Sequence, residues 1–310
     1  MNPLNAVRET TAWVMSQATH VSLDESAVVR QADVLAPKLK SPAFREWDTH
    51  HHYTDSSPLT AQYLLVLDAL NFCFWPDSTW SYNALALALK RVLEADRKAF
   101  QAERLAHLSV ETMRAWLGRD LPLMEERVRL LREVGEGLLE HFDGYAVNLI
   151  RAAEGSAARL VHLIAATFPG FRDHAIYRGR QVFFYKRAQI FAGDVWGAYG
   201  RKGLGAFHDI GDLTTFPDYR VPQVLRGLGI LRYSPELARR VDALEEIPAG
   251  SEEETEIRAA TVQAVERLCQ ALAERGHPIV PVELDWYLWR HGETAQANLP
   301  PHHRTLTIYY

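Results

Sequence analysis

Apolar residues recur at helical spacing along most of the chain. The apolar residues Val7, Ala12, Val14 and Met15 suggest a helix at the start of the sequence, and helical spacing returns in later segments. The pattern predicts helices over residues 3–18, 25–39, 60–77, 80–95, 110–118, 123–142, 155–168, 186–200, 219–229, 251–275 and 281–293. Residues 60–77 are so apolar that we expect this helix to lie centrally in the fold.

Signals for strands are few. Residues 175–185 predict a hairpin that turns at Arg178 and Gly179, and residues 201–216 are a loop rich in glycine. No repeat and no linker rich in proline, serine or glycine divides the sequence. We therefore predict a mainly α fold with little β structure, in a single domain over residues 1–310.

Polar residues mark several predicted helix starts. Ser109 and Ser251 each precede a helix, and either Ser78 or Ser81 precedes the helix over residues 80–95. Gly118 and Gly276 follow the last apolar positions of their helices, as residues that end helices often do.

Charge and cysteine content exclude several classes of protein. The formal net charge of −5 does not favour binding to duplex nucleic acid. Cys73 and Cys269 lie far apart in apolar surroundings, which indicates a reducing compartment and no disulfide framework. The sequence shows neither a signal peptide nor a run of the ~20 apolar residues that a membrane span needs. We expect a cytoplasmic protein with no membrane partner, and the sequence does not indicate its oligomeric state.

Motifs for the common cofactor chemistries are missing from the sequence. It contains no GxGxxG after a strand, no GxxxxGK[ST], no HExxH and no GxSxG. His50, His51 and His52 are consecutive, so their side chains point in different directions and lack the spacing of a metal site. We expect a loop with at most one functional histidine, no metal and no other cofactor.

Polar residues are concentrated among aromatic residues between Phe168 and Tyr233. The polar members are Lys186, Arg187, Gln189, Asp194, Asp209, Asp212, Asp218, Tyr219 and Arg220. Polar residues of an ordinary surface would not be expected beside aromatic residues such as Phe183, Phe184 and Trp196. In an ordinary core, the same polar groups would be unfavourable without partners. The combination predicts a lined pocket.

Asp218 is the strongest candidate for a catalytic group. It stands before the helix over residues 219–229, beside Phe216, and Tyr219 and Arg220 follow it. Because aspartate is among the commonest capping residues, the alternative is that Asp218 only caps this helix. The N–H donors and the helix dipole also favour an ionised carboxylate, which suits an enzyme that must stabilise a sugar cation. The two roles are compatible.

The next two candidates are the cations Lys186 and Arg187. Lys186 lies one helical turn before Ile190 and two before Asp194, where it could bind a phosphate or a carboxylate. Arg187 is equally well interpreted as a surface cation whose stem covers apolar surface.

Two further candidates lie near the end of the chain. Asp285 stands in LDWYLW beside Trp286, and an acid among aromatic residues is either paired structurally or ready to bind a cationic ligand. Arg304 belongs to a segment that could close over an anionic group or simply fix the terminus.

Several long segments carry a resemblance to a known family. They are LNFCFWPD (70–77), MEER (124–127), GRQVFFYKRAQI (179–190), DLTTFPDYRVPQVL (212–225), GSEEETEIRA (250–259), LDWYLW (284–289) and PPHHRTLTIYY (300–310). Together they resemble the queuosine salvage family of queuosine 5′-phosphate N-glycosylase/hydrolases. The resemblance runs in order from about residue 2 to residue 310.

The resemblance implies hydrolysis of the N-glycosidic bond of queuosine 5′-monophosphate. The products would be ribose 5-phosphate and queuine, a 7-deazaguanine base used in tRNA modification. The family is also similar in fold to helix-hairpin-helix DNA glycosylases, which place a lysine on one helix and an aspartate at the start of a following one. Lys186 and Asp218 occur in that order. Because the reaction passes through an oxocarbenium-like state, an ionised Asp218 below C1′ would stabilise it electrostatically or covalently.

The resemblance also suggests which residues bind the substrate. Queuine carries a secondary ammonium and a cyclopentene diol, which Asp285 is expected to hold, and His50 is expected to bond one edge of the base. The base is expected to stack on aromatic residues, namely Phe216, Trp286 and Trp289. The 5′-phosphate is expected to bind one or more cations among Lys186, Arg187, Arg220 and Arg304.

Three alternatives stay open at the level of sequence. A binding or carrier protein for a modified nucleoside or base would use the same aromatic residues but would not need the carboxylate of Asp218. A DNA glycosylase is disfavoured by the net charge of −5 and by the lack of a basic stripe. Transglycosylation differs from hydrolysis only in the group that attacks the sugar.

Overall fold

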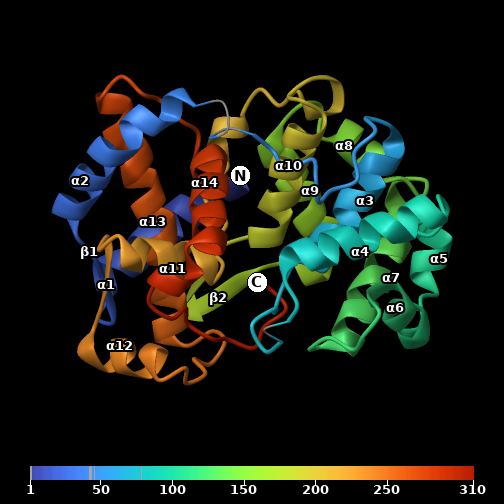
Figure 1. Ribbon diagram of the computed structural model, residues 1–310. Coiled ribbons are helices and arrows are strands. Elements are labelled where there is room, and N and C mark those ends of the chain that lie inside the picture. Colours follow the sequence, from blue (N-terminus) through green and yellow to red (C-terminus); the bar gives the residue numbers. More distant parts are fainter. Residues whose placement is uncertain (1, 42–43, 45, 78) are drawn as a thin grey trace. The chain divides into compact units, whose positions relative to one another are not determined.

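The computed structural model describes residues 2–41, 44, 46–77 and 79–310 (Figure 1). Helices dominate this part of the chain, and its strands form two antiparallel pairs, which confirms the prediction of a mainly α fold. By internal contacts the chain divides into unit 1, comprising Met1–Glu46, Asp173–Lys186 and Gly211–Leu306, and unit 2, comprising the remainder. The single domain over residues 1–310 stays a prediction.

Unit 1 contains six α-helices and four strands among its described residues. The helices are α1 (Pro3–Gln17), α2 (Glu25–Leu35), α11 (Arg220–Gly227), α12 (Pro235–Asp242), α13 (Glu252–Glu274) and α14 (Pro281–Thr294). The strands are β1 (Val21–Leu23), β2 (His174–Tyr177), β3 (Arg180–Phe183) and β4 (Leu231–Tyr233), and short 3-10 helices η1 (Ala36–Lys40) and η6 (Gln296–Asn298) complete the unit.

Helix α13 is the centre of unit 1. It packs against α1, α2, α11 and α14, and Figure 1 shows it between α2 and α14. Its buried face includes Ile257, Val265 and Leu268, which pack with Val224 of α11 and Leu284 of α14. Burial of such side chains contributes roughly 1.5–3 kcal/mol each. This packing positions α11 and α14, which carry the candidate site residues Arg220, Asp285, Trp286 and Trp289.

The hairpin predicted from the sequence is confirmed as β2 and β3. Arg178 and Gly179 occupy its turn with φ angles of 46° and 77°, the left-handed conformation of a two-residue hairpin loop. The other pair, β1 with β4, was missed by the sequence analysis. In this pair Val21 lies opposite Tyr233. A strand of three residues is too short to show an alternating pattern, so the sequence does not indicate a partner so far along the chain.

Unit 2 consists almost entirely of helices. They are α3 (Pro58–Ala69), α4 (Tyr82–Ala95), α5 (Ala102–Ala106), α6 (Val110–Leu117), α7 (Met124–His141), α8 (Ala146–Ala152), α9 (Ala157–Thr167) and α10 (Lys186–Ala198), with 3-10 helices η3 (Pro169–Phe171), η4 (Gly203–Gly205) and η5 (Ile210–Asp212). Lys186, the first residue of α10, belongs to unit 1, and the last two residues of η5 do as well. None of the described helices is long and apolar enough to cross a membrane.

Helix α3 is as buried as its composition predicts, but the expected extent to residue 77 is wrong. It ends at Ala69, and the side chain of Arg127 on α7 then binds the main chain that follows. The guanidinium donates to the carbonyl oxygens of Leu70 at 2.8 Å and Phe72 at 2.7 Å. Because these carbonyls are satisfied from another helix, the apolar segment can leave helical geometry while it stays buried.

Helix caps agree well with the sequence. Ser81, Ser109 and Ser251 each accept a first-turn N–H, and Gly118 has a φ of 71° directly after α6. Ser78, the alternative cap for α4, lies outside the described residues. Gly135 of α7 allows α5 and α7 to approach closely, since a Cβ there would lie 2.4 Å from the main-chain nitrogen of Ala106.

Candidate active site

Asp218 lies two residues before the first residue of α11 in unit 1 and is only 9% exposed. Its Oδ1 accepts the N–H groups of Arg220 at 2.9 Å and Val221 at 2.8 Å, which are the first donors of this helix. The prediction that Asp218 satisfies N–H groups at this helix start is therefore confirmed. These two hydrogen bonds hold the carboxylate in one orientation. A group that acts on a reacting atom needs such a fixed orientation.

The electrostatic surroundings of Asp218 are more complex than the sequence indicated. Burial raises the pKa of Asp218 above its ordinary value, whereas the charge of Lys186 and the N–H donors of Val221 and Arg220 oppose this rise. The donors therefore act in the expected direction, but the net shift of the pKa is upward because desolvation outweighs them.

Lys186 is the first residue of α10 and is 3% exposed. Its main-chain N–H donates to Oδ2 of Asp173 at 3.0 Å, so the start of this helix is held by a buried carboxylate. Its side-chain charge lowers the pKa of both Asp218 and Asp285. These three groups therefore form one electrostatic cluster in unit 1.

Asp285 lies on α14 and is 4% exposed. Its Oδ1 accepts the N–H of Phe216 at 2.8 Å and the hydroxyl of Thr215, and neither bond uses Oδ2. Burial raises the pKa of Asp285 to about 7, and the charge of Asp218 adds to the rise. Asp285 therefore holds the segment that leads into Asp218. Phe216, a predicted stacking residue, is buried in that segment.

The other candidates of unit 1 have structural partners. The Arg220 side chain donates to Oε1 of Glu293 at 2.7 Å and to Oε1 of Gln223 at 2.6 Å. The main-chain oxygen of Arg304 accepts the N–H of Ile247 at 2.7 Å, which attaches the C-terminal segment to unit 1. Trp286 and Trp289 lie on α14 with partly exposed side chains, and Trp289 packs against the core of unit 1.

Arg187 belongs to unit 2 and corrects one interpretation of the sequence. It is 1% exposed, and its guanidinium donates to the main-chain oxygens of Ala69, at 2.6 Å, and of Gly170. The interpretation of Arg187 as a surface cation is therefore wrong. The flanking aromatic residues suited a surface stem equally well, but the carbonyls that bind the guanidinium come from distant parts of the chain.

The three consecutive histidines, also in unit 2, differ sharply in burial. His50 is exposed, whereas His52 is buried between the main-chain oxygen of Asp48 at 2.6 Å and the hydroxyl of Tyr82 at 2.7 Å. Burial lowers the pKa of His52 to about 4. The sequence offered no signal to separate them, because the run lies in a loop without periodicity.

Sequence reasoning missed two charged residues beside the cluster. Asp173 and Arg258 are almost fully buried and form an ion pair with distances of 2.9 and 2.6 Å. A signal existed for Arg258, because it stands between Ile257 and Ala259 on the buried face of a long helix, where a charge needs a partner.

Comparisons of the sequence with known proteins identify the family of this chain. A model of the family described as queuosine salvage protein matches residues 51–310. The chain belongs to the queuosine salvage protein family.

Named relatives within this family cover essentially the full chain. A protein of Dictyostelium discoideum named queuosine 5′-phosphate N-glycosylase/hydrolase is 50% identical over 100% of both chains. A protein of Sphaerobacter thermophilus with the same name is 47% identical over 98% of this chain and 97% of its own. A mouse protein with that name is 34% identical over 100% of both chains. The range matched by the family model includes both Lys186 and Asp218.

One group of residues has the composition of a metal site. Among the described residues, ligand atoms of His20, Glu252 and Glu256 lie within 4.8 Å of one another. The carboxylate of Glu256, however, already accepts the main-chain N–H groups of residues 19–21 and the hydroxyl of Tyr177. Its role is explained by these bonds, which join α13 to β1 and the hairpin.

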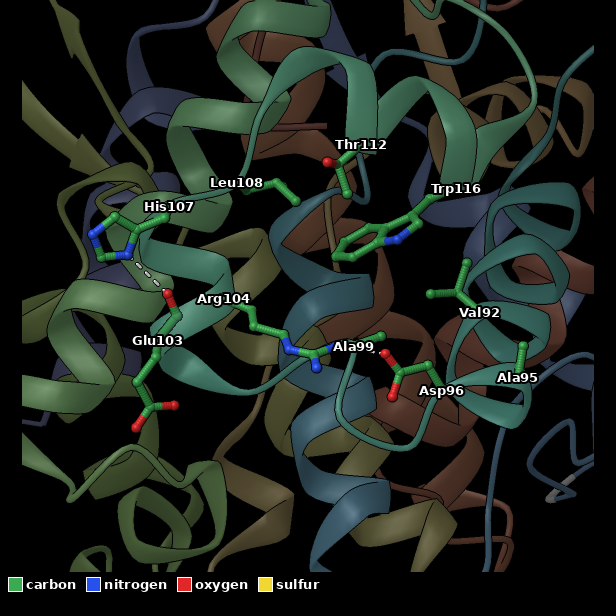
Figure 2. Close-up of a pocket in the computed structure, with 10 residues that line it drawn as sticks. All are labelled: Val92, Ala95, Asp96, Ala99, Glu103, Arg104, His107, Leu108, Thr112 and Trp116. Atoms are coloured by element: carbon green, nitrogen blue, oxygen red, sulfur yellow. Dashed lines mark hydrogen bonds and ion pairs between the residues drawn. The ribbon is translucent and has the colours of Figure 1, made fainter.

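A separate cavity of about 670 Å³ lies in unit 2 between α4, α5 and α6 (Figure 2). Its wall includes Trp116 and an ion pair between Arg104 and Asp96, whose side chains point toward each other in the figure. None of the site residues predicted from the sequence lines it. The family assignment therefore does not depend on this cavity.

Proposed function

We propose that this chain is a hydrolase that cleaves the N-glycosidic bond of queuosine 5′-monophosphate, releasing queuine and ribose 5-phosphate. The names of its relatives support the activity, since they describe queuosine 5′-phosphate N-glycosylase/hydrolases. The observation that carries the proposal is the buried cluster of Asp218, Lys186 and Asp285. Two carboxyl groups and one ammonium in a desolvated site suit a reaction that develops positive charge on a sugar.

In this proposal Asp218 acts on the ribose. As the C1′–N bond breaks, positive charge develops on the ring, and an oriented carboxylate stabilises it much more strongly in a desolvated site than in water. Water then supplies a hydroxyl group to C1′ and a proton to the departing base, directly or through a covalent intermediate on Asp218. The N–H groups of Arg220 and Val221 keep the carboxylate in place throughout.

Lys186 has two proposed roles in the same site. Its ammonium favours the ionised form of Asp218, and it belongs with Arg220 and Arg304 to the cations available for the 5′-phosphate. Arg187 is the weakest of the four predicted phosphate ligands, because its guanidinium already binds main-chain oxygens. His50, Phe216, Trp286 and Trp289 stay predicted contacts of the base.

The function is tested by incubating the protein with queuosine 5′-monophosphate and measuring free queuine by mass spectrometry. We expect queuine release from this nucleotide and none from guanosine monophosphate. Assay of the nucleoside queuosine in parallel shows whether the phosphate is required. Tight binding of the nucleotide without release would contradict the hydrolase and favour a carrier protein.

Asp285→Asn tests the proposed contact with the ammonium group of queuine. The amide keeps an oxygen for Phe216 and Thr215 but removes the negative charge, so we expect queuine binding to weaken by about tenfold and guanine binding to change little. Calorimetric titration of both bases measures the difference. Equal losses for the two bases would assign Asp285 only to the support of the Thr215–Phe216 segment.

We also propose that the protein works in the cytoplasm on a small molecule and does not bind duplex nucleic acid. The net charge of −5 supports the latter point. Binding of duplex DNA that weakens steeply as salt rises would contradict it. The expected likeness to helix-hairpin-helix DNA glycosylases stays part of this proposal, supported by the order of Lys186 on α10 and Asp218 before α11.

A further inference from the structure

A buried ion pair in unit 1 is bonded to the main chain at Lys186 and at Pro217, beside two of the candidate active-site residues. Nη1 and Nη2 of Arg258 on α13 bind Oδ1 and Oδ2 of Asp173 at 2.9 and 2.6 Å, the parallel two-bond geometry that guanidinium and carboxylate favour. Asp173 is 1% exposed and Arg258 is 2% exposed. A pair desolvated to this extent is costly to build, so its position in the fold calls for an explanation.

Asp173 organises the start of α10. Its main-chain oxygen accepts the N–H groups of Phe184 and Tyr185, both at 3.1 Å, and its Oδ2 accepts the N–H of Lys186 at 3.0 Å. Tyr185 has a φ of 52°, a conformation that costs energy for a residue with a side chain. Asp173 therefore stabilises the turn that determines where the Lys186 side chain begins.

Arg258 links Asp173 to the main chain that leads into Asp218. Its Nε donates to the main-chain oxygen of Pro217 at 3.1 Å, and Pro217 directly precedes Asp218. One guanidinium thus binds the carboxylate that holds Lys186 and the peptide that leads into Asp218. Its carbon Cζ lies 4.0 Å from the centre of the Phe184 ring, which fixes the plane of the group.

We propose that Asp173 and Arg258 are positioning residues that set the distance between Lys186 and Asp218 during hydrolysis. The inference rests on the proposed function, because it concerns the geometry of that reaction. Neither residue touches the substrate in this proposal. Both act through the main chain at Lys186 and Pro217, and a misplacement of about 1 Å at a reacting group can cost about 10²-fold in rate.

Arg258→Lys is the most informative variant. Lysine keeps the positive charge opposite Asp173, but one ammonium cannot reproduce two parallel bonds and a third bond to Pro217. We expect kcat to fall by about tenfold to a hundredfold and KM to stay within about threefold.

Arg127→Lys provides a matched control in unit 2. Arg127 is also buried, its Nε also donates to a proline carbonyl oxygen, that of Pro122 at 3.0 Å, and its Cζ also lies over a phenylalanine ring, Phe72, at 4.2 Å. It has no bond to the segments that carry Lys186 and Asp218. Both variants should melt at lower temperature than the wild type, but only Arg258→Lys should lose kcat.

The outcomes separate this inference from the proposed function. Release of queuine by the wild-type protein tests the function, and the ratio of variant to wild-type kcat tests the positioning role. A folded Arg258→Lys variant with wild-type kcat would overturn the inference, as would an equal loss of kcat in Arg127→Lys. If Arg258→Lys fails to fold, the double variant Asp173→Asn with Arg258→Gln replaces it, and wild-type kcat in that folded protein would overturn the inference equally.

Discussion

Asp218→Asn is expected to lower kcat for hydrolysis of queuosine 5′-monophosphate by at least about 10²-fold, with the affinity for queuine within about threefold of the wild type. The amide has nearly the same shape, and its oxygen can still accept the N–H groups of Arg220 and Val221. What the variant lacks is the negative charge that stabilises the sugar cation. Single-turnover measurement of queuine release, with queuine affinity measured by calorimetry, separates catalysis from binding.

Asp209→Asn is the control for this variant. Asp209 is another aspartate at a helix start, where its carboxylate accepts the hydroxyl of Ser156 and the N–H of Ala157, both at 2.6 Å. The substitution removes an equivalent charge from the start of α9 without touching the cluster in unit 1. We expect turnover close to that of the wild type. Substantial turnover by Asp218→Asn would remove Asp218 from the mechanism.

Lys186→Met is expected to move the acid limb of the activity profile to higher pH. The ammonium of Lys186 lowers the pKa of Asp218, so its removal raises that pKa further above the ordinary value. A higher pKa leaves less Asp218 ionised at a given pH, so activity lost at pH 6 should return in part as the pH rises toward 9. At neutral pH we expect kcat/KM to fall by about tenfold to a hundredfold, measured by queuine release between pH 5 and pH 9.

Lys186→Arg and the nucleoside substrate complete this experiment. Arginine keeps the charge, so its acid limb should lie near that of the wild type even if turnover is lower. A role for Lys186 in binding phosphate predicts a larger loss with the nucleotide than with queuosine, whereas an effect on Asp218 alone predicts equal losses. An acid limb that stays in place or moves to lower pH in Lys186→Met would contradict the electrostatic role.

Features that depend on a few neighbouring residues could be predicted from the sequence. The caps Ser109 and Ser251 reach donors within their own first turn, and the hairpin at Arg178 and Gly179 needs only two residues that accept the left-handed conformation. The bonds of Asp218 to the first N–H groups of α11 are equally local. The spacing of apolar residues also predicted the mainly α class, because the buried face of a helix recurs with a period that can be read from the sequence.

Partners that come from distant parts of the chain were decided only by the tertiary structure. The end of α3 at Ala69 depends on Arg127 of α7, and the surroundings of Asp285 depend on Thr215 and Phe216. Sequence reasoning expected the donors around Asp218 but not the net rise of its pKa, since that rise comes from burial.

Polar pairing inside the core follows the same physical rule. A buried charge needs a partner. Where the spacing of apolar residues indicates that a charged residue is buried, the sequence still does not show which residue pairs with it. Arg258 stood on the apolar face of a predicted helix, yet its partner Asp173 lies far from it along the chain. The sequence by itself determined most of the helices, several of their caps and the residue types of the candidate active site. The packing around α13 decided which of those residues meet, because desolvation and pairing depend on the whole fold.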